Sequence, residues 1–232
     1  MQDFKDYVSE NSKKRLLTIF CHPDDESFVA GGLFQEAAFL GLETHLVCLT
    51  GGESGKNSYK GGDLKKIRSG EFEKACKLLG IENYFLWNFP DAHLQTSVAA
   101  WLPEVEKLIN KLSPDIVVTF DFSGITGHPD HIASCREILD LVKKQKRKID
   151  LLWRVPDEYE VKFFKDNDAL KFASKANLKV SCGLTQSYKK IKSIYAHKSQ
   201  MPNFAFKLHI LEWCLFDHKE LYYKVDLTKK YD

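Results

Sequence analysis

The sequence predicts an α/β protein with a mainly parallel sheet. Two observations carry this prediction: short apolar runs of strand character alternate with longer helical patterns, and the alternation continues from residue 16 to residue 155. This spacing is typical of βαβ units, whose crossover helices cover a parallel sheet. With 232 residues, of which 44% are hydrophobic and 28% charged, we expect one domain over residues 1–232.

The individual elements follow from local patterns, taken in chain order. Gly41 and Gly80 each close a helical pattern, the Ser113-Pro114 pair separates a helix from a β-branched strand, and the pattern becomes less regular from about residue 156. The predicted strands are Leu16–Cys21, Thr44–Leu49, Tyr84–Trp87, Asp115–Phe120 and Ile149–Val155. The predicted helices are Phe28–Leu40, Leu64–Leu79, Val98–Leu112, Ile132–Val142 and Leu184–His197.

Charge and composition exclude several classes of protein. The net charge of +2 favours neither nucleic acid nor a membrane surface, and the basic run at 143–148 suits the negative end of the helix that precedes it. No apolar stretch approaches the ~18 residues of a membrane span, and residues 1–14 are too polar for a signal peptide. The six cysteines contain no C-x-x-C pair, so we expect reduced thiols in a cytoplasmic protein.

Two loops carry most of the chemistry-bearing side chains. "CHPDDESFVAGG", at 21–32, crowds one histidine and three acids directly behind the first predicted strand. The mutual repulsion of these carboxylates would be offset by a bound cation. "DFSGITGHPDH", at 121–131, follows the fourth predicted strand and adds His128 and His131. Since ligands bind beyond the carboxyl ends of parallel strands, we expect both loops at one rim of the sheet.

The residue types in these two loops suit metal-assisted hydrolysis. A catalytic zinc typically keeps three protein ligands and one open position. His22, one carboxylate of the first loop and one histidine of the second supply such a set. The remaining carboxylate and histidine would serve as general base and general acid. Each residue alone also fits a structural role, such as a helix N-cap or a loop residue bonded to backbone, but the two clusters together favour a site.

The same two loops resemble a known family. "HPDDE" behind a hydrophobic strand, with "GHPDH" about a hundred residues later, is similar to the PIG-L/LmbE-like superfamily of metal-dependent N-acetylglucosamine deacetylases. The resemblance covers roughly residues 15–200 and includes Arg68 and Glu71 of "IRSGEFEKACKLLGI", the "FPD" that ends at Asp91, and "YAHKSQ" at 195–200. It implies a Rossmann-like three-layer sandwich and an amino-sugar N-deacetylase that uses zinc-activated water.

The resemblance also implies roles for individual residues. The implied metal ligands are His22, Asp25 and His131, with Zn²⁺ as the metal and Fe²⁺ as its alternative. Three implied catalytic residues are Asp24 as general base, His128 to stabilise or protonate the intermediate, and Asp130 to orient His128. The implied substrate contacts are Arg68 and Asp91. The expected partner is a small-molecule amino sugar, and family members often form homo-oligomers.

Some features depart from the family or leave alternatives open. Several sugar deacetylases of the family carry a tyrosine shortly before the second motif, where this chain has 123–126 "SGIT". Membrane-anchored members carry an N-terminal span that this chain lacks, so it is more similar to the soluble bacterial branch. The loop "TGGESGKNS" fails the phosphate-loop pattern, because Thr50 replaces its first glycine and Asn57 its Ser/Thr. The alternative function is a non-catalytic metal-binding or nucleotide-binding protein.

The remaining histidines and one acid receive weaker assignments. The roles of Glu26 and His197 stay open, and His93 is near enough to Asp91 in sequence to reach the site. Structural roles are expected for the others, which are His45, His209 and His218.

Overall fold

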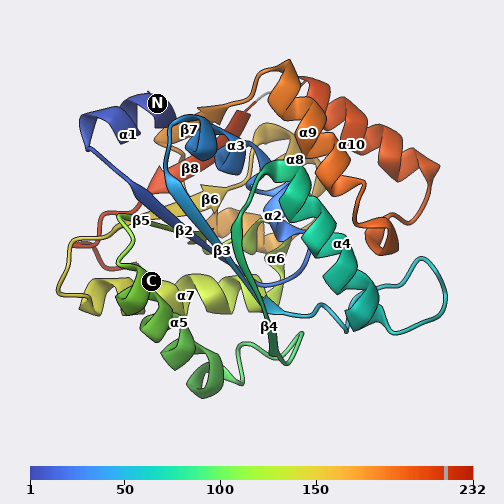
Figure 1. The fold of residues 1–232 in the computed structure, drawn as a ribbon, viewed down its shortest axis with the longest axis horizontal. Coiled ribbons are helices and arrows are strands. Elements are labelled where there is room, and N and C mark those ends of the chain that lie inside the picture. The colour runs from blue at the N-terminus through green and yellow to red at the C-terminus, as the bar shows by residue number, and fades with distance from the viewer. Residues whose placement is uncertain (217–218, 232) are drawn as a thin grey trace.

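The computed structural model describes residues 1–216 and 219–231, and within them the chain builds one mixed sheet. Its strand order is β1-β7-β8-β6-β5-β2-β3-β4 (Figure 1). All neighbouring pairs are parallel except those that β8 makes with β6 and β7. The strands are β1 Gln2–Asp3, β2 Arg15–Phe20, β3 Glu43–Thr50, β4 Asn83–Phe89, β5 Ile116–Phe120, β6 Asp150–Val155, β7 Leu178–Ser181 and β8 Lys219–Lys224.

Helices cover both faces of this sheet, as the α/β prediction requires. On one face α7 packs against β5 and β6 and contacts α5, and on the other α3 packs against β3, β7 and β8 and contacts α4 and α9 (Figure 1). The helices are α1 Phe4–Glu10, α2 Asp25–Phe28, α3 Gly31–Phe39, α4 Leu64–Leu79, α5 Val98–Leu112, α6 Gly124–Gly127, α7 Pro129–Lys144, α8 Glu158–Phe163, α9 Leu184–Ile194 and α10 Phe204–Phe216. Two 3₁₀ turns complete the set, η1 Asp168–Phe172 and η2 Lys198–Gln200.

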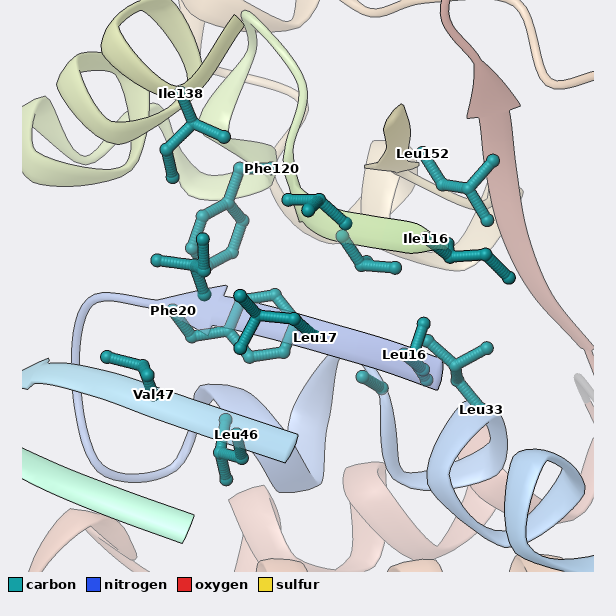
Figure 2. Packing of buried hydrophobic residues seen from close by; sticks show 14 of the residues in the cluster. Leu16, Leu17, Phe20, Leu33, Leu46, Val47, Ile116, Phe120, Ile138 and Leu152 are labelled. Atoms are coloured by element: carbon teal, nitrogen blue, oxygen red, sulfur yellow. The ribbon is translucent and has the colours of Figure 1, made fainter. Parts of the chain in front are cut away.

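The main core lies between the sheet and these helices. Figure 2 shows Leu17 and Phe20 of β2 packed beside Phe120 of β5, with Ile138 of α7 above them. These side chains are fully buried. The central strands β2 and β5 are thus apolar on both faces, which is why the sequence shows them as continuous apolar runs.

The sheet topology brings the two chemistry-bearing loops together. From β4 through β3, β2, β5 and β6 the strands are all parallel, and the chain order reverses between β2 and β5. A crevice forms at such a switch point, beyond the carboxyl ends of the two strands. Residues 21–25 follow β2 and residues 121–131 follow β5, so both loops lie at this crevice.

The mainly parallel α/β prediction is confirmed, but several elements differ from their predicted bounds. The helix predicted at 28–40 overlaps two helices, since α2 ends at Phe28 and the next helix, α3, begins only at Gly31. The second begins at Gly31 because Glu220 of β8 accepts the backbone N–H groups of Gly32 and Leu33 at 2.7 and 2.9 Å. A Cβ atom on Gly32 would lie 2.3 Å from Cys182 Sγ, so this close approach requires glycine.

The chain beyond residue 156 is more regular than its sequence pattern indicates. It supplies β7 and β8 to the sheet, and α8, α9 and α10 to the face that carries α3. Antiparallel β8 fills the gap between β6 and β7, a placement that no local pattern reports. Among the described residues, no helix is long and apolar enough to cross a bilayer.

Candidate active site

The first loop is a tight turn that Asp25 holds together. One oxygen of its carboxylate accepts the backbone N–H groups of Cys21 and His22 at 3.1 and 2.8 Å, which fixes the turn at the end of β2. Asp24, between them and the helix α2, has a positive φ of 118°. This backbone conformation is strained for any residue other than glycine, and such strain often occurs at functional positions.

The second loop positions His131 in one orientation. Its ring lies flat on Phe120, with centroids 3.8 Å apart and planes within 5°, and its Nδ1 lies 3.0 Å from the carbonyl oxygen of Gly124. A neutral ring that donates Nδ1–H to this carbonyl leaves Nε2 as a free acceptor. That nitrogen lies 3.1 Å from His22 Nδ1, so the two loops meet at a pair of imidazoles.

The donor atoms of three residues surround a point between the loops. His22 Nδ1 is 3.7 Å from Asp25 Oδ2, and His131 Nε2 is 3.4 Å from Asp25 Oδ1. The two histidines face different oxygens of Asp25, and with the 3.1 Å between the two nitrogens these separations lie near the edge of about 3.3 Å expected between tetrahedral zinc ligands at ~2.0–2.1 Å. The residues present therefore fit a metal ion with two nitrogen ligands and one carboxylate.

Two further groupings of ligand atoms share His22. The donor atoms of His22, His128 and His131 lie within 4.8 Å of one another, and so do those of His22, Asp91 and Asp130. In the second grouping His22 uses Nε2, which is 3.1 Å from Asp91 Oδ1 and 3.3 Å from Asp130 Oδ2. Each ring nitrogen of His22 thus faces a different set of donors.

The imidazoles of His22 and His131 differ in protonation, for different reasons. Burial lowers the pKa of His22, but hydrogen bonds to Asp130 and Asp91 outweigh it and raise the pKa to about 10. Burial, and then the positive charge on His22, hold the pKa of His131 well below its usual value. His131 is therefore neutral, which is the state that binds metal ions.

Asp130 contacts His22 rather than His128 with its carboxylate. Its oxygens also accept the backbone N–H groups of Ala92 and Leu94 at 2.8 and 2.9 Å, which tie the loop after β4 to the site. The hydrogen bond to His128 comes instead from the Asp130 backbone N–H, 3.2 Å from His128 Nδ1. Since Nδ1 accepts this bond, the proton of a neutral His128 lies on Nε2.

Asp24 lies at the wall of the cavity beside Arg68. The Arg68 guanidinium is 3.3 Å from Asp24 Oδ2, donates to Gly52 O at 2.9 Å and also donates to Pro23 O. Burial raises the pKa of Asp24 to about 6, whereas the charge on Arg68 acts in the opposite direction. Gly52 must be glycine, because its φ is +67° and a Cβ atom would lie 2.5 Å from the guanidinium carbon.

Glu26 and His197 form a buried pair that supports the first loop. His197 Nε2 is 2.7 Å from Glu26 Oε1, and Glu26 Oε2 accepts the strained Asp24 N–H at 3.0 Å. Glu71 holds the same "YAHKSQ" segment by accepting the Ser199 backbone N–H and hydroxyl at 2.8 and 2.6 Å. These contacts explain residues whose roles the sequence leaves open, and they place none of the three beside the cavity.

The glycine-rich loop after β3 braces Asp91 rather than forming a phosphate site. The Ser54 backbone N–H donates to Asp91 Oδ2 at 2.7 Å, and Glu53 accepts the Asp91 backbone N–H at 3.3 Å. Burial raises the pKa of Asp91, but the hydrogen bond to His22 outweighs it and lowers the pKa to about 2. His93, considered as a site residue from its position in the sequence, is exposed and does not line the cavity.

These residues open into a cavity of about 380 Å³. Every metal-binding, catalytic and substrate-binding residue predicted from sequence lines it except Asp130. The rest of the cavity lining is mainly apolar and was missed by sequence reasoning, because most of its aromatic residues are scattered through the part beyond residue 156. This apolar wall includes His209, which was expected to be structural, while His218 lies outside the described residues.

Known proteins resemble part of the chain. A 1D-myo-inositol 2-acetamido-2-deoxy-alpha-D-glucopyranoside deacetylase of Thermobifida fusca is 32% identical over 149 residues, which are 53% of this chain and 52% of that protein. A probable N-acetyl-alpha-D-glucosaminyl L-malate deacetylase 2 of Bacillus cereus is 28% identical over 142 residues, 59% of this chain and 64% of that protein. The matches thus span about half to two thirds of these relatives.

Structural comparison adds the fold. The N,N'-diacetylchitobiose deacetylase of Pyrococcus horikoshii superposes with a TM-score of 0.76 at 20% identity, covering 95% of this chain and 87% of that one. The family model described as "PIG-L: GlcNAc-PI de-N-acetylase" matches residues 17–142, which are more than half of the 232 residues and include both loops of the site. The protein therefore belongs to the PIG-L family, as its "HPDDE" and "GHPDH" motifs predict.

Proposed function

We propose that the protein is a metal-dependent hydrolase that removes the N-acetyl group from a small molecule or conjugate containing N-acetylglucosamine. The observation that carries the proposal is one cavity in which a three-residue donor set, His22, Asp25 and His131, lies beside the carboxylate of Asp24 and the imidazole of His128. A structural metal site would need neither of the last two groups. The names of the relatives support the substrate class.

The donor set of His22, Asp25 and His131 is favoured over the other two groupings. His22 then binds through Nδ1 and donates Nε2–H to the carboxylates of Asp91 and Asp130, the arrangement that usually orients a metal-binding histidine. Two nitrogens and one carboxylate favour Zn²⁺, with Fe²⁺ as the alternative. When bound, such an ion polarises an amide carbonyl and makes water a better acid.

Asp24 is proposed as the group that moves protons. Its carboxylate lines the cavity, and 22% of its side chain is exposed to solvent. Although Asp24 precedes α2, its side chain accepts no hydrogen bond from the backbone N–H groups of that helix. In amide hydrolysis the oxygen of water adds to the acyl carbon and its proton passes to Asp24. The carbon–nitrogen bond then breaks as the proton passes from Asp24 to the amine, so that acetate and a free amino sugar leave.

His128 is proposed to stabilise the developing negative charge. Because the Asp130 backbone N–H occupies its Nδ1, a neutral His128 presents Nε2–H to the cavity as a donor. A preoriented donor of this kind stabilises an oxyanion without taking part in proton transfer. It would serve in place of the tyrosine that some family members carry near this loop.

Arg68 and Asp91 are proposed to lie against the sugar, since both line the cavity. Most of their polar atoms are already engaged, Arg68 by Asp24 and two carbonyl groups, and Asp91 by His22 and Ser54. We therefore expect these two side chains to determine the shape and charge of the cavity beside the sugar. They have few hydrogen bonds left to offer to the sugar hydroxyl groups.

The test is a deacetylation screen across N-acetylglucosamine conjugates after chelation and metal add-back. Acetate release should require the metal and should be lost in His22→Ala and His131→Ala together with metal binding. Asp24→Asn should bind metal and release acetate at least about 10²-fold more slowly. Metal binding without acetate release from any conjugate would contradict the proposal and favour a non-catalytic metal protein.

A further inference from the structure

We propose that the cavity extends from the metal-binding residues into a preformed aromatic subsite that receives an apolar group of the substrate. The aromatic subsite consists of Phe28, Tyr159, Phe163, Phe206, Ile210 and Trp213, which line the same cavity as the residues proposed to be catalytic. The inference rests on the proposed function and adds a substrate class to it: amino sugars that carry an aromatic or alkyl substituent.

The rings of the aromatic subsite are already ordered. Trp213 lies nearly parallel to Phe28, with centroids 6.5 Å apart and planes at 18°, and nearly parallel to Tyr159 at 6.0 Å and 16°. Its indole N–H donates to Asp157 Oδ2 at 3.2 Å, and Lys190 Nζ lies 4.8 Å from its ring centre. Because these contacts within the protein already fix the rings, the rings lose little conformational freedom when a ligand binds.

Buried charges hold the helices behind these rings. Arg154 of β6 is fully buried and bonds both carboxylate oxygens of Glu160 at 2.9 Å, which anchors α8 to the sheet. Asp157 completes a capping box at the start of the same helix, and its second oxygen is the one that binds Trp213. The sheet therefore fixes both α8 and the inner face of α10, which carry most of the aromatic subsite.

The polar atoms of the wall are used within the protein. The Tyr159 hydroxyl lies 2.7 Å from His209 Nδ1 and 3.1 Å from the His209 carbonyl oxygen, and the Trp213 N–H is taken by Asp157. The hydroxyl groups of a second sugar ring would find few hydrogen-bond partners on this wall. An apolar group gains from the same surface, which favours it over a disaccharide.

The subsite is continuous with the reaction centre, so one molecule reaches both. Phe28 ends α2, the short helix that Asp25 begins, and both residues line the cavity. The apolar group and the reacting amide thus belong to one substrate. An apolar group on the anomeric oxygen keeps the N-acetyl group of the proposed substrate, whereas one on the acyl side of the nitrogen would make the substrate a longer N-acyl sugar. Binding measurements separate these two attachments.

Calorimetry on the zinc-loaded protein tests the subsite with ligands that contain no amide. The probes are glucosamine, phenyl glucosaminide, glucosamine with a hexyl group on nitrogen, and the disaccharide chitobiose in its deacetylated form. At least one of the two apolar probes should bind about 10-fold or more tightly than glucosamine, from the apolar area that it buries. Whichever probe gains shows on which side of the sugar the apolar group lies.

Two phenylalanines of α10 supply a matched pair of variants. Phe206 lines the cavity, whereas Phe204 is 73% exposed and does not. Phe206→Ala should remove most of the affinity gain for the apolar probe, and Phe204→Ala should retain it. Phe163→Ala, at a cavity-lining side chain that is 46% exposed, gives a second variant with little risk to folding.

The outcomes separate the subsite from the proposed function. Equal binding of glucosamine and both apolar probes, a larger gain for chitobiose, or an unchanged gain in both Phe206→Ala and Phe163→Ala would overturn the aromatic subsite. Tight binding of an apolar probe in a protein that releases no acetate would leave the subsite standing and contradict the deacetylase proposal.

Discussion

Replacing Asp130 by asparagine tests the metal site that we propose. The carboxylate accepts three hydrogen bonds, from Leu94 N on one oxygen and from Ala92 N and His22 Nε2 on the other. Asparagine has nearly the same shape but only one accepting oxygen and no charge. Either the His22 ring or one backbone N–H must therefore lose its acceptor.

The expected loss follows from the bond between Asp130 and His22. A hydrogen bond to a charged group contributes about 1.5–3 kcal/mol, and a tenfold change in affinity corresponds to about 1.4 kcal/mol. The residue that orients a metal-binding histidine typically accounts for a similar 10–100-fold in metal affinity. We expect Asp130→Asn to weaken zinc binding about 10–100-fold, while the zinc-saturated variant keeps its donor set.

The assay is competition for zinc between the metal-free protein and a chromophoric chelator, with the rate of acetate release measured separately at saturating zinc. Asp140→Asn is the control, since Asp140 is an exposed residue of the same helix α7. Unchanged zinc affinity with a slow zinc-saturated enzyme would refute the reasoning and place the Asp130 carboxylate on His128. Loss of about a thousandfold or more would show instead that Asp130 is itself a ligand, together with Asp91 and His22 Nε2.

Three further predictions concern stability. Zinc at 100 times its Kd should stabilise the protein by about 2.7 kcal/mol and raise Tm by about 5–10 °C in a thermal melt. A chelator should reverse this effect. An unchanged Tm would mean that the folded state has no zinc site. Burial raises the pKa of Asp150, but Lys13 and the Tyr7 hydroxyl, whose oxygen is 2.6 Å from the carboxylate, outweigh it and lower the pKa. The ionised Asp150 therefore stabilises the fold at pH values above its unfolded pKa, and this stabilisation is lost as acid is added. Urea unfolding at about pH 5 and about pH 3 should therefore show a smaller acid loss in Tyr7→Phe than in wild type, and an equal loss would count against the bond. In the same assay Gly32→Ala should destabilise the protein by about 1–3 kcal/mol, because the new Cβ atom would meet Cys182. Gly70→Ala in α4, where a Cβ atom would have no neighbour within 4 Å, should stabilise it by about 0.5–1 kcal/mol. Similar values for the two variants would contradict the packing argument.

Local patterns determined the elements whose signals lie within a few residues. The predicted bounds of α4 and α5 agree with the structure, because Asp63 caps the first helix, Gly80 ends it, and Ser113-Pro114 ends the second. The family could also be predicted, from the spacing of the two motifs. The placement of both loops at one rim could be predicted as well, because loops that follow parallel strands lie at the same edge of the sheet. The sequence thus predicted a candidate site, and all of its residues except Asp130 line one cavity.

Only the tertiary structure decided how those residues use their atoms. Which nitrogen of His22 faces His131 and which faces Asp130 depends on contacts between residues more than 100 positions apart. The break between α2 and α3 likewise depends on Glu220, 188 positions beyond Gly32. The aromatic wall is the clearest case: its rings come from helices separated along the chain, and no periodicity reports that they share a cavity. Local sequence determines which groups a segment offers, whereas packing against distant segments determines what each group meets.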